Sequence, residues 1–369
     1  MQPKVSVVMS VYNGTPYLRK SVESILNQTC KDFEFIIIDD GSTDNTWKIL
    51  TEYASQSQQI KLFKNEENIG LTKSLNKGLK LARGEYIARQ DADDVSLPER
   101  FDLQIRFLDA HLEVGAIGSS AQVIDEQGMF VRQSNVVLEH ESMQACLLVN
   151  NYNCLYHSSM IVRRSLLQAV RGYREDLRYA QDYELWLRLS QVTRIENLPD
   201  VLVCVRRSNT NITKKHRQEQ LQCAFEISLK AVQESLEEPL DKDAYQRFWW
   251  ADLRLSDEDA YQRFWLAAHG QDAQLQSVDI QRLGTFWQLL ANHSGGAKFW
   301  GPRLSNLAYK LLHCRQPVEG LQLLSVVVRQ LKMPIQVDRI FRGMIKPYVP
   351  PLGHQLWQSW QLKHKQETS

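Results

Sequence analysis

The first ninety residues alternate between short apolar runs and stretches whose apolar residues recur every three or four positions. The run at residues 5–11 is almost continuously apolar, which is typical of a strand buried on both faces. Leu71, Leu75 and Leu79 show the spacing of one helix face. The resulting order, βαβαβαβ, predicts a right-handed, doubly wound, mostly parallel α/β sheet. We expect its strands at residues 5–11, 33–38, 60–63 and 86–88.

Beyond residue 94 this alternation loosens, and from about residue 216 strands become scarce. We therefore predict an α/β domain over residues 1–215 and a smaller α-helical C-terminal domain over residues 216–369. In the second domain the sequence of residues 243–249 recurs at residues 259–265, which we interpret as a helical hairpin. In the first, further strands are expected at residues 114–118, 122–124, 129–131, 158–162 and 201–205.

Composition and charge exclude some classes of protein. Hydrophobic residues make up 43% of the chain, which is typical of a globular protein, and a net charge of +1 argues against a nucleic-acid partner. The six cysteines have neither zinc-site nor disulfide spacing. Because residues 1–4 lead directly into a predicted strand, we expect no signal peptide, and no apolar stretch in the sequence approaches the ~20 residues that span a bilayer. We therefore expect a cytoplasmic protein with reduced thiols.

Residues 298–369 carry eleven Lys and Arg against three Asp and Glu. This basic segment has two interpretations. It fits peripheral association with an anionic membrane on the cytosolic face, which would bring a lipid-linked substrate close. It fits equally well a helical domain with a solvated basic face.

Acidic residues directly follow two of the predicted strands. Asp39 and Asp40 end the second strand, and Asp91, Asp93 and Asp94 follow the fourth. The carboxyl ends of parallel strands meet at one edge of a sheet, so we expect these side chains to converge there. Clustered carboxylates repel one another and are costly to desolvate, which favours a cation or a polar ligand between them.

The Asp91-x-Asp93 pair offers the hard oxygen ligands that Mg²⁺ and Mn²⁺ prefer. An EF-hand is excluded because the loop lacks the required glycine and glutamate, and the remaining alternative is an acidic loop that caps the next helix. The turn after the first strand contains a single glycine, Gly14, and therefore no glycine-rich phosphate cradle. A divalent cation on the acidic residues would neutralise bound phosphates instead.

These segments together resemble a known enzyme family. Residues 5–14, 36–46, 68–70, 82–87 and 91–94 match, in order and spacing, the inverting glycosyltransferases of family 2, which have a GT-A fold. The resemblance covers about residues 4–207 and is closest over the first hundred. It implies a nucleotide-sugar donor, Mn²⁺ or Mg²⁺ as cofactor, and a carbohydrate or lipid-linked glycan as acceptor.

The resemblance also implies residue roles. Asp40 is expected to accept from the ring N–H of the base, uracil in a UDP-sugar, while Asp91 approaches the ribose and Asp93 binds the metal. Asp182 is expected to be the general base, with a helix cap as the structural alternative. Gln181 stands where similar enzymes usually have Glu, which removes a charge beside the base. The other implied positions are Ser10, Val11, Tyr12, Asn13, Asn68, Gly70 and Ala92 for the donor, and His157 and Arg206 for the acceptor or diphosphate.

Two other functions remain open at this point. A sugar nucleotidyltransferase has a similar sheet, but it would need a basic, glycine-rich loop after the first strand. A non-catalytic nucleotide-sugar-binding scaffold would not need the acidic residues. Among neighbouring charged residues, Glu184 ranks behind Asp182 as the base, and Arg89 is expected to form a local ion pair rather than to bind phosphate.

Overall fold

The computed structural model describes residues 2–134, 136–138, 140, 143–144, 147, 154–208, 216–235 and 242. All of them belong to the first of two compact units, Met1–Asp272, and the second unit is Ala273–Ser369. The 16-residue repeat and the basic segment lie outside the described residues. The helical C-terminal domain, and the domain boundary at residue 215, therefore stay predictions.

The first ninety residues form the predicted alternation of strands and helices. The elements of this half are β1 (Val5–Val11), α1 (Leu18–Leu26), β2 (Phe33–Asp39), α2 (Thr46–Gln56), β3 (Ile60–Lys64), α3 (Leu71–Leu81) and β4 (Tyr86–Arg89). The elements that follow are β5 (Val95–Ser96), α4 (Arg100–Ala110), β6 (Val114–Ile124), β7 (Phe130–Gln133), η1 (His157–Ser159), β8 (Ile161–Arg163), α6 (Arg164–Ala169), α7 (Gln181–Ser190), β9 (Arg194–Arg206) and α9 (Arg217–Ser235).

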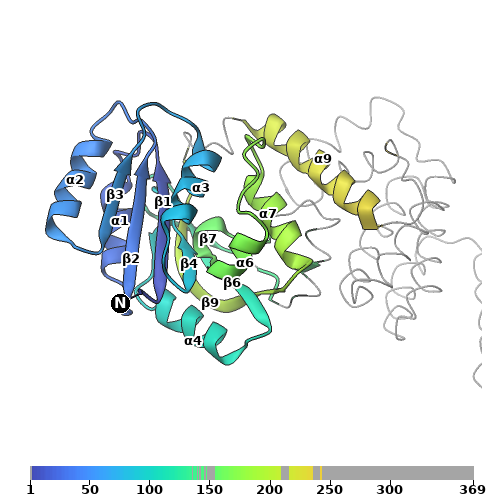
Figure 1. Ribbon diagram of the computed structural model, residues 1–369. Helices are drawn as coiled ribbons and strands as arrows, with labels where there is room; N and C mark the ends of the chain where they lie inside the picture. Colours follow the sequence, from blue (N-terminus) through green and yellow to red (C-terminus); the bar gives the residue numbers. More distant parts are fainter. Residues whose placement is uncertain are drawn as a thin grey trace, which may run out of the picture. The chain divides into compact units, whose positions relative to one another are not determined.

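The strands form one sheet in the order β3-β2-β1-β4-β8-β6-β9-β5, with β7 paired to β6. Figure 1 labels β1 to β4 of this sheet, together with β6, β7 and β9. The first four strands of this order are parallel, so the predicted α/β class is confirmed. β8 is antiparallel to both of its neighbours, whereas β6 and β9 are parallel. The carboxyl ends of β1, β2 and β4 therefore lie at one edge, where the acidic residues follow.

Two strand predictions were wrong in detail. The expected strands at 114–118 and 122–124 are one continuous strand, β6, because the residues between them are also buried and paired with β9. The expected strand at 158–162 begins later, and its first part is the 3₁₀ turn η1. This turn places His157 and Ser158 just ahead of β8 rather than within it.

Helices cover both faces of the parallel strands (Figure 1). On one face, alternate residues of β1 such as Val7 and Met9 share a core with Leu18 of α1 and Phe101 of α4. On the other face α3 packs closely, because a Cβ at Gly78 would lie 2.6 Å from Val8 Cγ1. The sheet is therefore doubly wound, as predicted.

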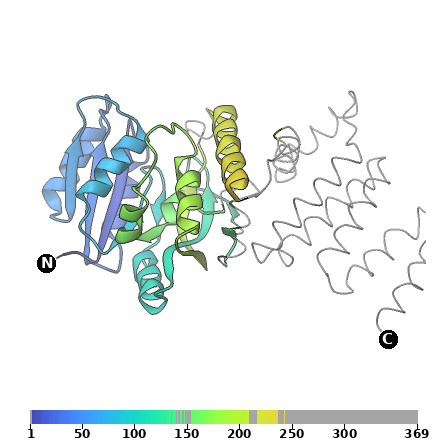
Figure 2. The same cartoon turned by 45° about the vertical axis from the view of Figure 1, so that its right-hand side comes forward.

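Helix α9 lies beside α7, as both Figures 1 and 2 show. Just ahead of α7, the Tyr179 ring stacks on His216, and the Cys223 thiol donates to the Tyr179 carbonyl at 3.1 Å. These contacts attach α9 to the segment that leads into α7. Within the described part of the chain, no helix has both the length and the apolar character needed to cross a membrane.

Candidate functional site

The turns that follow β1 and β2 are hydrogen-bonded to each other. The backbone N–H of Asn13 donates to Ser42 Oγ at 3.0 Å. The side-chain oxygen of Asn13, Oδ1, accepts from the backbone N–H of Thr43 at 2.9 Å. Asn13 has a φ of 52°, a left-handed conformation that Asn tolerates better than most residues. Of the residues predicted here, Ser10 and Val11 are buried at the strand end, whereas the Tyr12 side chain is 49% exposed.

The Asp40 carboxylate is a centre of hydrogen bonding. Its Oδ1 accepts from Asn65 Nδ2 at 2.8 Å, Ser74 Oγ at 2.9 Å and the Ile69 N–H at 3.0 Å. Its Oδ2 accepts from the Gly70 N–H at 2.9 Å. Three of these four donors share Oδ1, whereas Oδ2 has two lone pairs and a single donor, so Oδ2 is the oxygen that has room for a further donor. Asp40 thus holds the loop around Gly70, where Asn68 is exposed, and can still accept from a ligand.

We expect Asp40→Asn to destabilise the protein even without a ligand. The amide nitrogen would face the Gly70 N–H, and the charge assistance to four hydrogen bonds would be lost. The expected loss is about 2 kcal/mol, or a fall in melting temperature of roughly 4–8 °C, measured by thermal denaturation. Asp39→Asn is the control, because Asp39 lacks these partners; equal losses in the two variants would contradict the role given to Asp40.

Asp39 is a functional candidate to which the sequence analysis gave no specific role. It is the last residue of β2 and is fully buried. Its Oδ1 accepts from the Ser42 N–H at 2.9 Å, but its Oδ2 has no hydrogen-bond partner among the described residues. The signal in the sequence was its position at the carboxyl end of a strand. A buried oxygen without a donor is costly, so this atom is a second candidate acceptor at the same edge.

The loop after β4, residues 91–94, brings three carboxyl groups together, and we call it the acidic loop. Arg89 forms an ion pair with Asp91, which confirms the local role predicted for Arg89. Burial alone would raise the pKa of Asp91, but this guanidinium holds the pKa below its usual value. Ala92 is half-buried in the loop.

The pKa values of the other two carboxyl groups of the acidic loop, those of Asp93 and Asp94, are shifted in the opposite direction. Burial and the charge of Asp91 raise the pKa of Asp93 to about 6. Burial, and then the charges of Asp93 and Asp91, raise the pKa of Asp94 well above its usual value. In both cases burial is the larger cause and the crowding of negative charge adds to it, and a nearby divalent cation would favour the ionised carboxylates.

The residues present fit a magnesium or manganese ion that is shared with a ligand. Asp93 supplies a hard oxygen donor in a loop of excess negative charge, as these ions require. The described residues contain no group of three or more His, Cys, Asp and Glu that could hold a metal by themselves. Mg²⁺ commonly keeps several waters and binds through one or two carboxylates together with phosphate oxygens, so a single carboxylate such as Asp93 is compatible with such an ion.

Arg206, which we expected to contact the acceptor or the diphosphate, is the last residue of β9. Only 2% of this residue is exposed. Its backbone N–H donates to Asp94 Oδ1 at 2.8 Å, and its Nε donates to the Asp93 carbonyl at 3.0 Å. Its guanidinium also lies 4.4 Å from the centre of the Tyr17 ring. Arg206 thus fixes the acidic loop through the Asp94 carboxylate and the Asp93 backbone carbonyl.

Asp182 lies at the start of α7. The N-cap of this helix is Ala180, with a left-handed φ of 54°, so Asp182 is the second helical residue and not the cap. Glu184, the rival carboxylate, is bound to Arg188 at 2.7 Å and 2.8 Å, which agrees with its lower rank. A carboxylate in the first turn also interacts favourably with the helix dipole.

His157 connects Asp182 with the acidic loop. Its Nε2 lies 2.7 Å from the hydroxyl oxygen of Tyr173, with which it shares a hydrogen bond. Burial and the charge of Arg89 lower the pKa of His157 to about 4, whereas Asp91 and Asp182 act in the opposite direction. Both carboxylates therefore lie close enough to act on one imidazole. The fold thus brings Asp91 and Asp182 into one neighbourhood.

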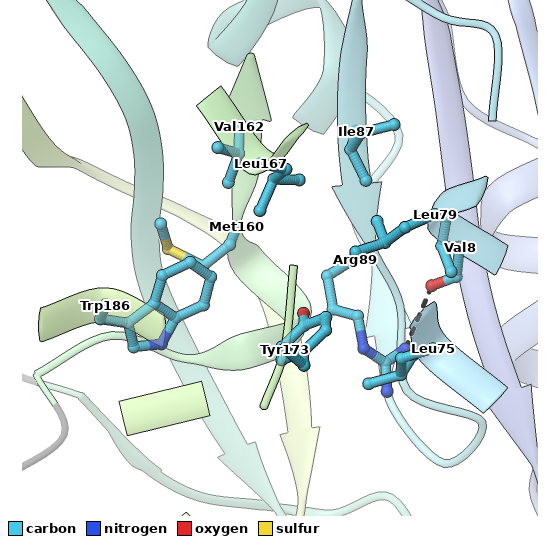
Figure 3. A pocket seen from close by; sticks show the side chains of 10 residues that line it. All are labelled: Val8, Leu75, Leu79, Ile87, Arg89, Met160, Val162, Leu167, Tyr173 and Trp186. Carbon is cyan, nitrogen blue, oxygen red and sulfur yellow. Dashed lines mark hydrogen bonds between the residues drawn. The ribbon is translucent and has the colours of Figure 1, made fainter. Parts of the chain in front are cut away.

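A small cavity lies beside this neighbourhood (Figure 3). Among its lining residues are Val8 and Leu75 on the α3 side, and Tyr173 and Trp186 next to His157. Arg89 also lines it, while one of its terminal nitrogens donates to the Val8 carbonyl at 3.2 Å. Arg89 therefore spans from the apolar interior to Asp91, which explains how its charge reaches both Asp91 and His157.

Comparison with known proteins finds relatives that belong to one enzyme family. Residues 6–171 match the family described as Glycosyl transferase family 2. The chain is 39% identical over 208 residues to the putative glycosyltransferase EpsE of Bacillus subtilis, an alignment that covers 55% of this chain and 73% of EpsE. It is 32% identical over 215 residues to the O-antigen biosynthesis glycosyltransferase WbnJ of Escherichia coli, covering 57% of this chain and 82% of WbnJ.

Among solved structures, S. aureus TarS 1–349 in complex with UDP-GlcNAc superposes with a TM-score of 0.54. The superposition covers 88% of this chain and 90% of the TarS chain at 21% identity, and it shows a shared fold. The named sequence relatives are glycosyltransferases rather than nucleotidyltransferases. This chain therefore belongs to glycosyl transferase family 2, a family of sugar transferases, and has the predicted GT-A fold.

Proposed function

We propose that this enzyme is a metal-dependent, inverting glycosyltransferase that moves a sugar from a nucleoside-diphosphate donor to an acceptor hydroxyl. UDP-sugars are the donors we favour, and the acceptor is a carbohydrate or a lipid-linked glycan. The observation that carries this proposal is the convergence of Asp91 and Asp182 on His157, next to the crowded charges of Asp93 and Asp94.

The donor would bind at the carboxyl ends of β1, β2 and β4. Asp40 Oδ2 has the capacity to accept the N–H of a uracil ring, and the exposed Tyr12 ring lies in the adjoining turn. The same fold holds UDP-GlcNAc in TarS. We assign the ribose to the vicinity of Asp91 and Ala92, between this base site and Asp93.

Asp93 is the residue that would hold the cation. When bound, Mn²⁺ or Mg²⁺ supplies Lewis-acid stabilisation of the negative charge on a departing nucleoside diphosphate. The chain itself contributes a carboxylate whose ionisation is disfavoured by burial and by Asp91, so it gains from a positive neighbour. His157, neutral near pH 7, adds no competing positive charge beside the acidic loop.

Asp182 would act as the general base. Its carboxylate takes the proton of the acceptor hydroxyl while that oxygen forms a bond to the anomeric carbon of the donor sugar. The bond between this carbon and the diphosphate oxygen breaks in the same displacement, and its electron pair leaves with the diphosphate. A single displacement inverts the anomeric centre and needs no nucleophilic side chain.

A thermal-shift panel of nucleotide sugars, each with and without Mn²⁺, tests this proposal. A UDP-sugar at one hundred times its dissociation constant should stabilise the protein by about 2.7 kcal/mol. That corresponds to a rise in melting temperature of roughly 5–11 °C, and it should require Mn²⁺. UMP, which lacks the second phosphate, is the control. A panel in which no nucleotide sugar shifts the melting temperature would refute the proposal.

The site of action within the cell is also part of the proposal. A lipid-linked acceptor would lie at the cytosolic face of a membrane, and the basic segment of residues 298–369 would favour an anionic surface. Co-sedimentation of the full chain with anionic and neutral vesicles measures this association directly.

A further inference from the structure

Ser158 connects the two ends of the acidic loop. It lies in η1, 67 residues further along the chain than Asp91, and is 1% exposed. Its Oγ accepts from the Asp91 N–H at 3.1 Å and lies 2.9 Å from Asp91 Oδ2. The same Oγ lies 2.5 Å from Asp94 Oδ2. One buried hydroxyl therefore contacts both Asp91 and Asp94.

These contacts restrict how the loop can move. A hydroxyl has one proton to donate and two lone pairs, so Ser158 can accept from the Asp91 N–H while it donates to a carboxylate oxygen. Asp94 is held from the other side by the Arg206 N–H at 2.8 Å. Ser158 does not contact the carboxylate of Asp93, which lies between the two residues it holds. The loop is thus fixed at both ends, and its middle carboxylate is left for a ligand.

Ser159 provides a natural comparison. It is adjacent to Ser158 and equally buried. Its Oγ donates to the Tyr156 carbonyl at 2.8 Å and accepts from the Ser119 N–H at 3.3 Å, with no contact to the acidic loop. The two serines are therefore adjacent and similarly buried, but only the Ser158 hydroxyl forms hydrogen bonds with the acidic loop.

We propose that Ser158 is a positioning residue for the metal and diphosphate site, because its hydroxyl keeps Asp91 and Asp94 in place on either side of Asp93. This inference rests on the proposed function. Residues that orient a metal ligand without touching the metal typically contribute 10–100-fold to metal affinity or activity.

The test compares Ser158→Ala with Ser159→Ala by calorimetric titration of UDP in the presence of Mn²⁺. We expect Ser158→Ala to bind about 10–100-fold more weakly than the unaltered chain, and Ser159→Ala to stay within about threefold, since only the first removes a contact to the acidic loop. Ser158→Thr keeps the hydroxyl and should bind within about threefold as well. Unchanged binding by Ser158→Ala, or an equal loss in Ser158→Thr, would overturn the proposal.

Hydrogen exchange provides a readout that needs neither metal nor activity. In Ser158→Ala the Asp91 N–H loses its acceptor, so the peptide that contains residues 91–94 should exchange faster than in the unaltered chain and in Ser159→Ala. Equal exchange in all three proteins would refute the positioning role. If the unaltered chain shows no Mn²⁺-dependent UDP binding, the proposed function fails, and the exchange measurement still decides the role of Ser158.

Discussion

Asp182→Asn is expected to lower kcat by about 10²–10⁴-fold while leaving donor binding unchanged. The amide has nearly the shape of the carboxylate but cannot take a proton from the acceptor hydroxyl. A loss of this size corresponds to roughly 2.7–5.5 kcal/mol of transition-state stabilisation. Asp182 is in the first turn of α7 but is not its N-cap, and loss of the helix-dipole interaction should cost about 0.3–1 kcal/mol of stability. Steady-state kinetics with a UDP-sugar and acceptor measure kcat, and calorimetry measures donor affinity.

Asp176→Asn is the matched control for this prediction. Asp176 precedes α7, has a largely exposed side chain, and pairs with Arg174 on the surface. Its substitution should leave kcat within about twofold, as expected for an exposed ion pair. A general base acts in the transition state, so kcat and kcat/KM should fall together in Asp182→Asn. A variant that turns over at the normal rate would remove Asp182 from the mechanism.

Asp93→Ala is expected to abolish Mn²⁺-dependent binding of UDP. The substitution removes the carboxylate that we assign to the cation, and the neighbouring Asp91 is already paired with Arg89. Calorimetric titration of UDP with and without Mn²⁺ should then give the same weak binding. The loss of donor affinity distinguishes this variant from Asp182→Asn, which should bind the donor normally.

Stability provides an internal check on the same variant. The pKa of Asp93 is raised to about 6 in the folded protein by burial and by Asp91, so ionised Asp93 destabilises the fold near pH 7. The melting temperature of ligand-free Asp93→Ala should therefore be equal to or higher than that of the unaltered chain. Glu99→Ala, at the exposed N-cap of α4, is the control and should retain Mn²⁺-dependent binding. Full retention of that binding in Asp93→Ala would place the metal elsewhere.

Much of the fold could be predicted because its signals are local. The apolar run at residues 5–11 and the spacing of Leu71, Leu75 and Leu79 specify a buried strand and an amphipathic helix without reference to the rest of the chain. The predictions failed where neighbours decided the outcome. Residues 119–121 continue β6 because β9 pairs with them, and η1 replaces the start of a strand just ahead of β8.

The candidate site shows the same division. The position of acidic residues at one edge of the sheet could be predicted, because the parallel strands β2 and β4 present their carboxyl ends there. The hydrogen-bond partners of each site residue could not be predicted from the sequence. The hydrogen-bonded partners are far apart in the sequence: 34 positions separate Asp40 from Ser74, 112 separate Asp94 from Arg206, and 16 separate His157 from Tyr173. No spacing rule relates residues so far apart.

By itself, the sequence determined the order of strands and helices in the first ninety residues, the edge of the sheet that carries the acidic residues, and the enzyme family. The tertiary structure alone decided which oxygen of Asp39 has no donor among the described residues, why the pKa of Asp93 is raised, and that Ser158 contacts both ends of the acidic loop. The physical reason is that burial, charge crowding and hydrogen bonding depend on distances between side chains. Those distances are set only when separate elements pack together.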